Sequence, residues 1–159
     1  MSRFALSLVF ALLALPATVF AQAGPAQLTG AVTTPLTLDE TTLKALPATT
    51  LDVSFETSKG PETGHYTGAL LWDLVNKAVL VNDEGKNAAL KHTLLITGSD
   101  GYAVSVALGE LDPNFANTQV LLAYDGADGK ASFDHLRLVV PGDVHGGRSV
   151  KDVVGIEVK

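Results

Sequence analysis

The chain has 159 residues, enough for one hydrophobic core but not for two, and its 47% hydrophobic and 18% charged residues are typical of a globular protein. Eleven Lys and Arg against 17 Asp and Glu give a net charge of −6, which argues against nucleic acid or an anionic membrane surface as the main partner. The chain contains no cysteine, which excludes disulfides, thiolate metal sites and cysteine nucleophiles.

Residues 1–23 have the three parts of a secretory signal peptide. A single cation, Arg3, precedes an apolar run at residues 4–15, and small residues around Ala21 offer a signal-peptidase site. The apolar run is shorter than the roughly 20 residues of a transmembrane helix, although an uncleaved membrane anchor is the alternative interpretation. The pattern predicts export to the periplasm and a mature domain over residues 24–159, with no membrane insertion after cleavage.

The first half of this domain has signals for two strands and two helices. Residues 28–38 are rich in β-branched side chains and predict an edge strand, because Pro35 cannot donate a hydrogen bond to a neighbouring strand. Residues 39–46 begin with acidic side chains and end before a proline, which predicts a short helix. The alternation in residues 50–56 predicts a half-buried strand, and residues 70–79 carry an apolar stripe at helical spacing.

The second half consists of predicted strands joined by turns. Five strands are expected there, at residues 92–97, 102–107, 119–124, 136–140 and 153–158. The first two flank a Gly-Ser-Asp-Gly sequence at residues 98–101, which is a tight-hairpin signal. Strands outnumber helices and do not alternate with them, so the expected fold class is α+β, dominated by a mixed or antiparallel sheet.

Common catalytic and metal-binding motifs are missing from the sequence. No Gly-x-Ser-x-Gly nucleophile elbow occurs, and residues 126–130 have two residues between their glycines where a phosphate loop has four. We therefore interpret residues 126–130 as a hairpin turn. The four histidines (His65, His92, His135 and His145) show no zinc-ligand spacing.

Residues 139–151 contain the densest basic spot of the predicted mature domain. A hydrophobic strand leads into Pro-Gly, two more glycines follow, and His145, Arg148 and Lys151 add basic groups. Glycines let a backbone approach a ligand closely and expose N–H donors, and the planar Arg148 guanidinium suits a phosphate or a flat heterocycle. The alternative is a surface loop whose charges are solvated.

This segment resembles the end of the molybdopterin-binding domain of sulfite-oxidase-type oxidoreductases, with its Pro-Gly, glycine loop, Arg-x-Val-Lys (residues 148–151) and closing strand. Three further stretches are similar to that family in the same order, namely YTGALLWDLV (66–75), LITGSDGY (95–102) and VLLAYDG (120–126). Together they cover most of residues 50–158. The resemblance implies a mostly β, mixed-sheet or barrel-like fold with a few short helices, and a pterin or molybdopterin-like cofactor.

The chain departs from this family at the residue that ligates molybdenum. The catalytic members carry a cysteine after the early strand, whereas residues 54–60 here offer only hydroxyls such as those of Thr57 and Ser58. The resemblance therefore implies a non-catalytic, exported binding protein for a pterin-like small molecule. Such a protein would act as a sensor or carrier for a membrane-bound signalling partner. The alternatives are a molybdopterin-dependent oxidoreductase or subunit with a non-cysteine metal ligand, and an interaction domain without the pocket.

Six residues are candidates for the pterin site: Arg148, Ser149, Lys151, His145, Tyr102 and Trp72. Arg148 would stack on the heterocycle or bind its carbonyl edge, the next two would donate hydrogen bonds, and His145 would close over the ligand. Tyr102, at the hairpin mouth, and Trp72, in the apolar-striped helix, are the aromatic candidates, and packing is the alternative role for each. No catalytic residue and no metal ligand is predicted.

Three more residues are expected near this pocket. His65 and Tyr66 precede the predicted helix, in an expected loop that would line the site. Asp100 would either bind a pterin amino group or cap its own Asp-Gly turn. A nearby ligand and a simple structural role therefore both remain open for these side chains.

Overall fold

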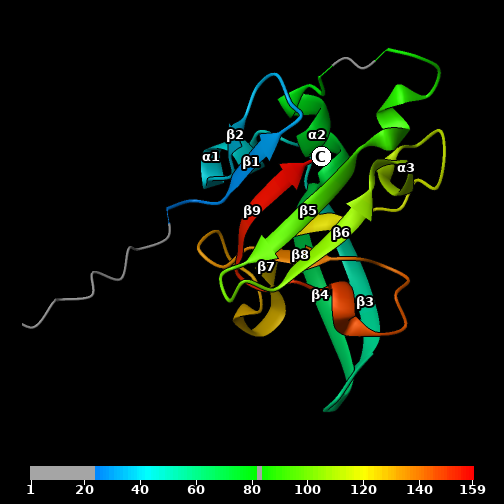
Figure 1. Ribbon diagram of the computed structural model, residues 1–159. Coiled ribbons are helices and arrows are strands. Elements are labelled where there is room, and N and C mark those ends of the chain that lie inside the picture. The colour runs from blue at the N-terminus through cyan, green and yellow to red at the C-terminus, as the bar shows by residue number, and fades with distance from the viewer. Residues whose placement is uncertain (1–23, 82–83) are drawn as a thin grey trace, which may run out of the picture.

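The computed structural model describes residues 24–81 and 84–159 (Figure 1). The predicted signal peptide, residues 1–23, lies outside the described residues, so cleavage and export stay predictions. Within the described part of the chain, no helix is long and apolar enough to cross a membrane.

The described chain forms two β-sheets. Its strands are β1 (Gln27–Gly30), β2 (Leu36–Thr37), β3 (Thr49–Thr57), β4 (Gly60–Leu70), β5 (Thr93–Gly98), β6 (Ala103–Ala107), β7 (Leu121–Gly126), β8 (Arg137–Val139) and β9 (Val153–Val158). The five-stranded sheet has the order β2-β1-β9-β5-β6, in which only β1 and β9 are parallel neighbours. The four-stranded sheet, β3-β4-β7-β8, is antiparallel. This architecture confirms the α+β, mostly β fold class with a mixed sheet.

Short helices and 3-10 turns connect the strands in the described chain. They are α1 (Glu40–Lys44), α2 (Leu71–Ala78) and α3 (Leu108–Leu111), with the 3-10 turns η1 (Ala88–Lys91), η2 (Ala127–Gly129) and η3 (Gly146–Arg148). Asp39 Oδ1 accepts a hydrogen bond from the Thr42 N–H at 2.8 Å and so caps α1. The apolar stripe of α2, comprising Leu71, Leu74, Val75 and Ala78, is fully buried. Both predicted helices are confirmed, each a few residues shorter than expected.

The predicted strands of the second half are also present. β5 and β6 form the expected hairpin, in which Asp100 Oδ1 accepts a hydrogen bond from the Tyr102 N–H at 2.9 Å and closes the turn. β7 and β8 pair across the second turn-rich stretch. The last predicted strand, β9, lies at the centre of its sheet between β1 and β5, where its valines and isoleucine are buried or half-buried.

Two sequence-based expectations are corrected by the structure. Residues 28–38 form two strands and not one edge strand, because Gly30 adopts a φ of 96° that turns the chain back from β1 into β2. β2 is the edge, while β1 pairs with β9 on its other side. His65 and Tyr66 lie on β4 and not in a loop, because β4 pairs with β3 over residues 60–68.

The four-stranded sheet is covered on both faces at β7 and β8. Leu122 and Leu138 face a large core that also contains α2 and the inner face of the five-stranded sheet. The alternate residues of the same strands, Leu121 and Val139, face a smaller core, whose other members are Val53, Phe55, Tyr66, Ala123 and Ala131. This smaller core lies beneath the glycine loop.

Candidate functional site

The glycine loop around η3 and the tip of the β3–β4 hairpin form two adjoining hollows, which we call the β3–η3 site. The first, of about 350 Å³, is lined by residues 56–58 and 145–147. The second, of about 240 Å³, shares some of this lining and is otherwise formed by Phe55, Lys59, Glu62, Arg137, Ser149 and Lys151. The volume of the first hollow lies within the range of about 300–1,000 Å³ that is typical of small-molecule sites, and the second hollow adjoins it.

Backbone contacts hold the glycine loop against β3. The Glu56 N–H donates a hydrogen bond to the Val144 carbonyl at 2.8 Å, and Glu56 and His145 form a short parallel bridge. Gly146 lies on the Phe55 ring, since a Cβ at this position would come within 2.6 Å of a ring carbon. A side chain at residue 146 would therefore lift the loop from the strand, which explains the need for glycine in physical terms.

Arg137 on β8 places a buried cation at the site. Its side chain is only 3% exposed, and it donates hydrogen bonds to Ser149 Oγ at 3.0 Å and to Glu62 Oε1 at 3.2 Å. The guanidinium carbon lies 6.0 Å from the Phe55 ring centroid and 5.2 Å from that of Tyr66, which are cation–π distances. Burial of a charge is costly unless it is paired and hydrogen-bonded, and these contacts compensate for that cost.

Sequence reasoning missed both Arg137 and Glu62. The available signal was that Arg137 interrupts the apolar run at residues 136–140, where a lone cation in a buried strand must have a partner. Strand alternation places its side chain on the same face as Val139, toward the smaller core. The identity of the partner could not be read from the sequence, since Glu62 lies 75 positions away.

Three of the predicted site residues line the β3–η3 site. His145 lies on the rim of the first hollow, while Ser149 and Lys151 line the second. Ser149 Oγ accepts the Arg137 hydrogen bond and itself donates one to the Leu138 carbonyl at 3.3 Å, so its rotamer is held. The Lys151 side chain is exposed and belongs to the lining of the second hollow together with Lys59.

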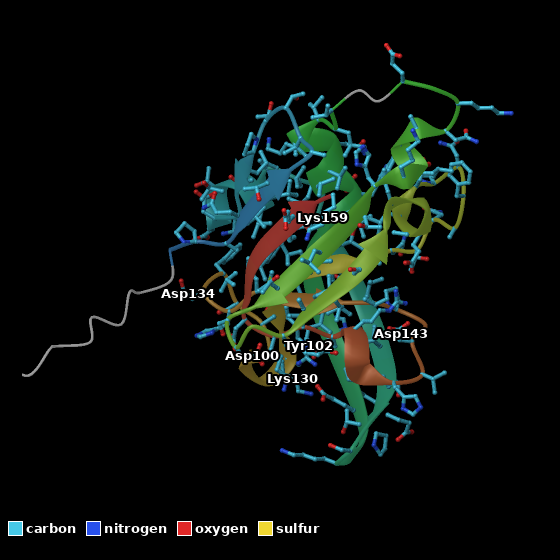
Figure 2. All side chains as sticks on the ribbon, in the orientation of Figure 1. Asp100, Tyr102, Lys130, Asp134, Asp143 and Lys159 are labelled. Carbon is cyan, nitrogen blue, oxygen red and sulfur yellow. The ribbon has the colours of Figure 1, made fainter. Side chains whose placement is uncertain are left out.

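The side chains of Arg148 and Tyr102 both make hydrogen bonds that hold the glycine loop in place. Arg148 donates to both carboxylate oxygens of Asp143, at 2.7 and 2.9 Å, and to Glu110 Oε2 at 2.9 Å. These hydrogen bonds raise the pKa of Arg148 further above its ordinary value, first through Asp143 and then through Glu110. Tyr102 Oη donates to the Gly147 carbonyl at 2.6 Å, and Figure 2 shows Tyr102 and Asp143 on either side of η3. Direct contact of Arg148 or Tyr102 with a ligand stays a prediction.

The structure does not bring Trp72 to this site. Trp72 lies on α2, half-buried against the large core, and it is not among the residues that line either hollow. The packing alternative for this tryptophan is therefore the one that the geometry supports. His65, which projects from β4, is exposed and pairs through Nδ1 with Asp52 Oδ1 at 2.7 Å.

A hollow larger than either part of the β3–η3 site lies near α1 and the start of β9. Its volume is about 600 Å³, and four carboxylates belong to its lining: Asp39, Glu40, Asp134 and Asp152. One basic group, His135, accompanies them and pairs with Asp152 at 2.7 Å. An anionic or electron-rich ligand would be repelled there. The β3–η3 site is the better candidate despite its smaller size, because its lysines and arginine outnumber its two carboxylates, Glu56 and Glu62.

Comparisons with known proteins agree with this fold. Among solved structures, the sulfane dehydrogenase SoxCD from Paracoccus pantotrophus matches with a TM-score of 0.66 and 22% sequence identity, over 86% of this chain. The match covers only 38% of the SoxCD chain, and at this identity the likeness concerns the fold alone. No curated protein matches the chain. The family model of the oxidoreductase molybdopterin binding domain matches residues 26–159, and the chain therefore belongs to this family.

Proposed function

We propose that the protein is a non-catalytic binding protein for a pterin-like small molecule, which it holds at the β3–η3 site. Membership of the molybdopterin-binding family supports a pterin- or molybdopterin-related role. The observation that carries the finer proposal is a hollow built around a buried arginine, in a chain that has no cysteine to ligate molybdenum. The protein would bind the organic part of such a cofactor without its redox chemistry.

The groups that line the site fit a flat, polar heterocycle with an anionic tail. Arg137 offers a fixed positive charge, and Ser149 a hydroxyl beside it. Glu56 offers a carboxylate for the amino groups at a pterin edge, because a carboxylate accepts two parallel N–H hydrogen bonds. The ammonium groups of Lys59 and Lys151 suit a phosphate as point charges.

The same groups do not fit a thiolate-ligated molybdenum centre. The full sequence contains no cysteine, so the soft sulfur ligand of the family's catalytic members has no counterpart. Over residues 24–81 and 84–159, no three His, Asp or Glu side chains gather in a way that could hold a metal ion.

One observation favours the alternative of a molybdopterin oxidoreductase, or a subunit of one, with an oxygen ligand. Thr57 and Ser58 stand where the resemblance expects the cysteine, and both line both hollows. A hydroxyl from either residue would then replace the thiolate. Molybdenum analysis of protein purified from cells supplied with molybdate separates the two proposals, since stoichiometric metal contradicts a binding-only role.

The predicted signal peptide supports a role outside the cytoplasm. We propose that the mature protein is periplasmic and acts as a sensor or carrier, passing its ligand or its ligand-bound state to a membrane-bound signalling partner. Fractionation of cells and mass determination of the periplasmic form test the location and the cleavage near Gly24. A full-length mass in the membrane fraction would contradict both.

Calorimetry tests ligand binding directly. We expect the purified protein to bind reduced pterins or free molybdopterin with a Kd of about 1 μM or tighter, which corresponds to about −8 kcal/mol. Lys151→Ala should lower the affinity for molybdopterin, which has a phosphate, by about tenfold, or 1.4 kcal/mol. The affinity for a phosphate-free tetrahydropterin should stay unchanged. Lys91→Ala, an exposed lysine on η1, is the matched control. No heat with any pterin would favour an interaction domain that has lost its pocket.

A further inference from the structure

We propose that the buried hydroxyl of Tyr66 is a further ligand-binding group of the β3–η3 site, which hydrogen-bonds the polar edge of the bound heterocycle once the side chains that cover it in the structure move aside. This inference rests on the proposed binding function and adds a specificity-determining residue to it. Tyr66 belongs to none of the groups that line the hollows at their surface, because it lies one layer deeper, in the smaller core.

The Tyr66 hydroxyl is buried without a hydrogen-bond partner. Tyr66 is 0% exposed, and its Oη has no hydrogen-bond partner among the described residues. A buried hydroxyl that gives up water without gaining a hydrogen bond destabilises the folded state. Buried polar groups are otherwise nearly always satisfied, so this one calls for a partner from outside the protein, either a ligand group or a water.

The Tyr66 ring leans along β4 toward the β3–η3 site. A Cβ on Gly64 would lie 2.7 Å from Tyr66 Cζ and 2.9 Å from Oη, whereas one on Gly126 would lie 2.8 Å from Cδ1, near the base of the ring. The hydroxyl end therefore lies over residue 64, two positions along β4 from residue 66. Continuing in the same direction and on the same face of the strand, the next side chain is that of Glu62, which lines the second hollow.

Arg137 connects this hydroxyl to the site. Its guanidinium carbon lies 5.2 Å from the Tyr66 ring centroid, and the same side chain lines the second hollow. Desolvation raises the pKa of Tyr66, with Arg137 opposing and Glu62 adding to the shift. The phenol is therefore neutral at physiological pH and keeps its proton. It can donate a hydrogen bond to an acceptor such as the keto oxygen of a pterin.

Glycines at two positions provide the space for this ring. The closest approach at Gly64 is to Tyr66 Cε2, and at Gly126 it is to Tyr66 Cδ1. Any larger residue at either position would push the ring out of its place. Phenylalanine would occupy the same space and pack against the same apolar neighbours, so the hydroxyl is not required for packing. This makes Tyr66→Phe a clean test of the hydroxyl alone.

The test compares ligand binding and stability of Tyr66→Phe with those of the wild type. Calorimetry with tetrahydropterin should show binding weakened about tenfold, or 1.4 kcal/mol, while thermal unfolding shows a Tm that is unchanged or higher. Tyr124→Phe is the matched control, because Tyr124 is half-buried and stacks on Phe133 with 4.7 Å between ring centroids, at the edge of the large core. Equal affinity of Tyr66→Phe and wild type would overturn the inference.

A second measurement on the wild type does not depend on how the variant folds. The chain has three tyrosines, so protein labelled with ¹³C at tyrosine Cζ gives three resonances, which Tyr102→Phe and Tyr124→Phe assign. Saturation with tetrahydropterin should shift the Tyr66 resonance, and a resonance that stays in place contradicts the proposal. If the wild type binds no pterin at all, the proposed function fails first. Binding by the wild type with an unmoved Tyr66 signal refutes only this further inference.

Discussion

Replacement of Arg148 tests whether this arginine holds the glycine loop or contacts the ligand. In the structure Arg148 donates three hydrogen bonds, two to Asp143 in the same loop and one to Glu110 on α3. Glu110 uses its other oxygen to accept from the Ala107 N–H at 3.0 Å, at the start of α3. Arg148 thus ties the loop to the end of β6, and we expect Arg148→Ala to loosen this connection.

The size of the effect follows from the exposure of the three side chains. The side chain of Arg148 is 34% exposed, that of Asp143 23% and that of Glu110 35%, so water partly screens the attraction between them. A fully exposed pair contributes about 0.2–1 kcal/mol, and a buried hydrogen bond to a charged group about 1.5–3 kcal/mol. With two carboxylates, one bound in bidentate fashion, we expect a loss of about 1–2 kcal/mol. Arg148→Lys should recover less than half of this, because an ammonium cannot form the planar fork.

Urea unfolding measures this loss. For a slope of about 2 kcal/mol per molar urea, a loss of about 1–2 kcal/mol moves the midpoint of Arg148→Ala down by about 0.5–1 M. Amide exchange should accelerate over residues 142–149, while the exposed control Lys91→Ala changes neither quantity. If the main role of Arg148 is to clamp the loop through Asp143 and Glu110, ligand affinity falls by no more than about tenfold, since the site is loosened but its contacts to the ligand survive. An unchanged midpoint together with complete loss of binding would refute the clamp and favour direct contact with the ligand.

Three further predictions concern the fold. Hydrogen bonds from Thr42 hold the pKa of Asp39 below its ordinary 3.8, so its contribution to stability is present above about pH 4 and lost as pH falls through the lowered pKa. The Tm difference between wild type and Asp39→Ala should therefore shrink in acid, and a constant difference would contradict the cap. Leu74→Ala should cost about 2–5 kcal/mol in urea unfolding, because Leu74 is completely buried, and a loss below 1 kcal/mol would contradict this packing. Gly30→Ala should lower the Tm more than Gly101→Ala: both glycines have positive φ, but only Gly30 would collide with the backbone of β9.

The elements that could be predicted from sequence are those with a local cause. The acidic start of the helix at residue 39, the apolar stripe of α2 and the Asp-Gly turn before β6 each act within a few residues, and the short helix, the amphipathic helix and the hairpin predicted from them were confirmed. β4 was missed for the opposite reason. Its sequence, GPETGHYTGAL, contains a proline and three glycines and has little intrinsic strand propensity. It becomes a strand because β3 pairs with it along residues 60–68 and because its glycines leave room for neighbouring groups.

The site was predicted to the extent that it is built from the glycine loop. His145, Ser149 and Lys151 follow one another closely in sequence, and all three line the β3–η3 site. Trp72 was selected for its ring alone, and sequence contains no measure of how far α2 lies from η3. Glu62 was not selected, because nothing in the sequence distinguishes it from the other 16 acidic residues. Only the structure shows that it pairs with the buried Arg137.

The two arginines show why charge density in a sequence is a weak guide to the residue that a ligand meets. Arg148 stands in the most basic stretch of the chain, yet carboxylates 5 and 38 positions away bind its guanidinium, which is about a third exposed. Arg137 stands alone in an apolar strand, and its side chain is 3% exposed beside the hollow. Both guanidinium groups are paired with carboxylates, that of Arg137 with Glu62, but attraction between charges grows as water is removed, so a hydrogen bond from Arg137 to a ligand should be stronger than one from the screened Arg148. If calorimetry bears out the proposed function, an isolated cation in a predicted core strand will have indicated the site more directly than the cluster of cations in the loop.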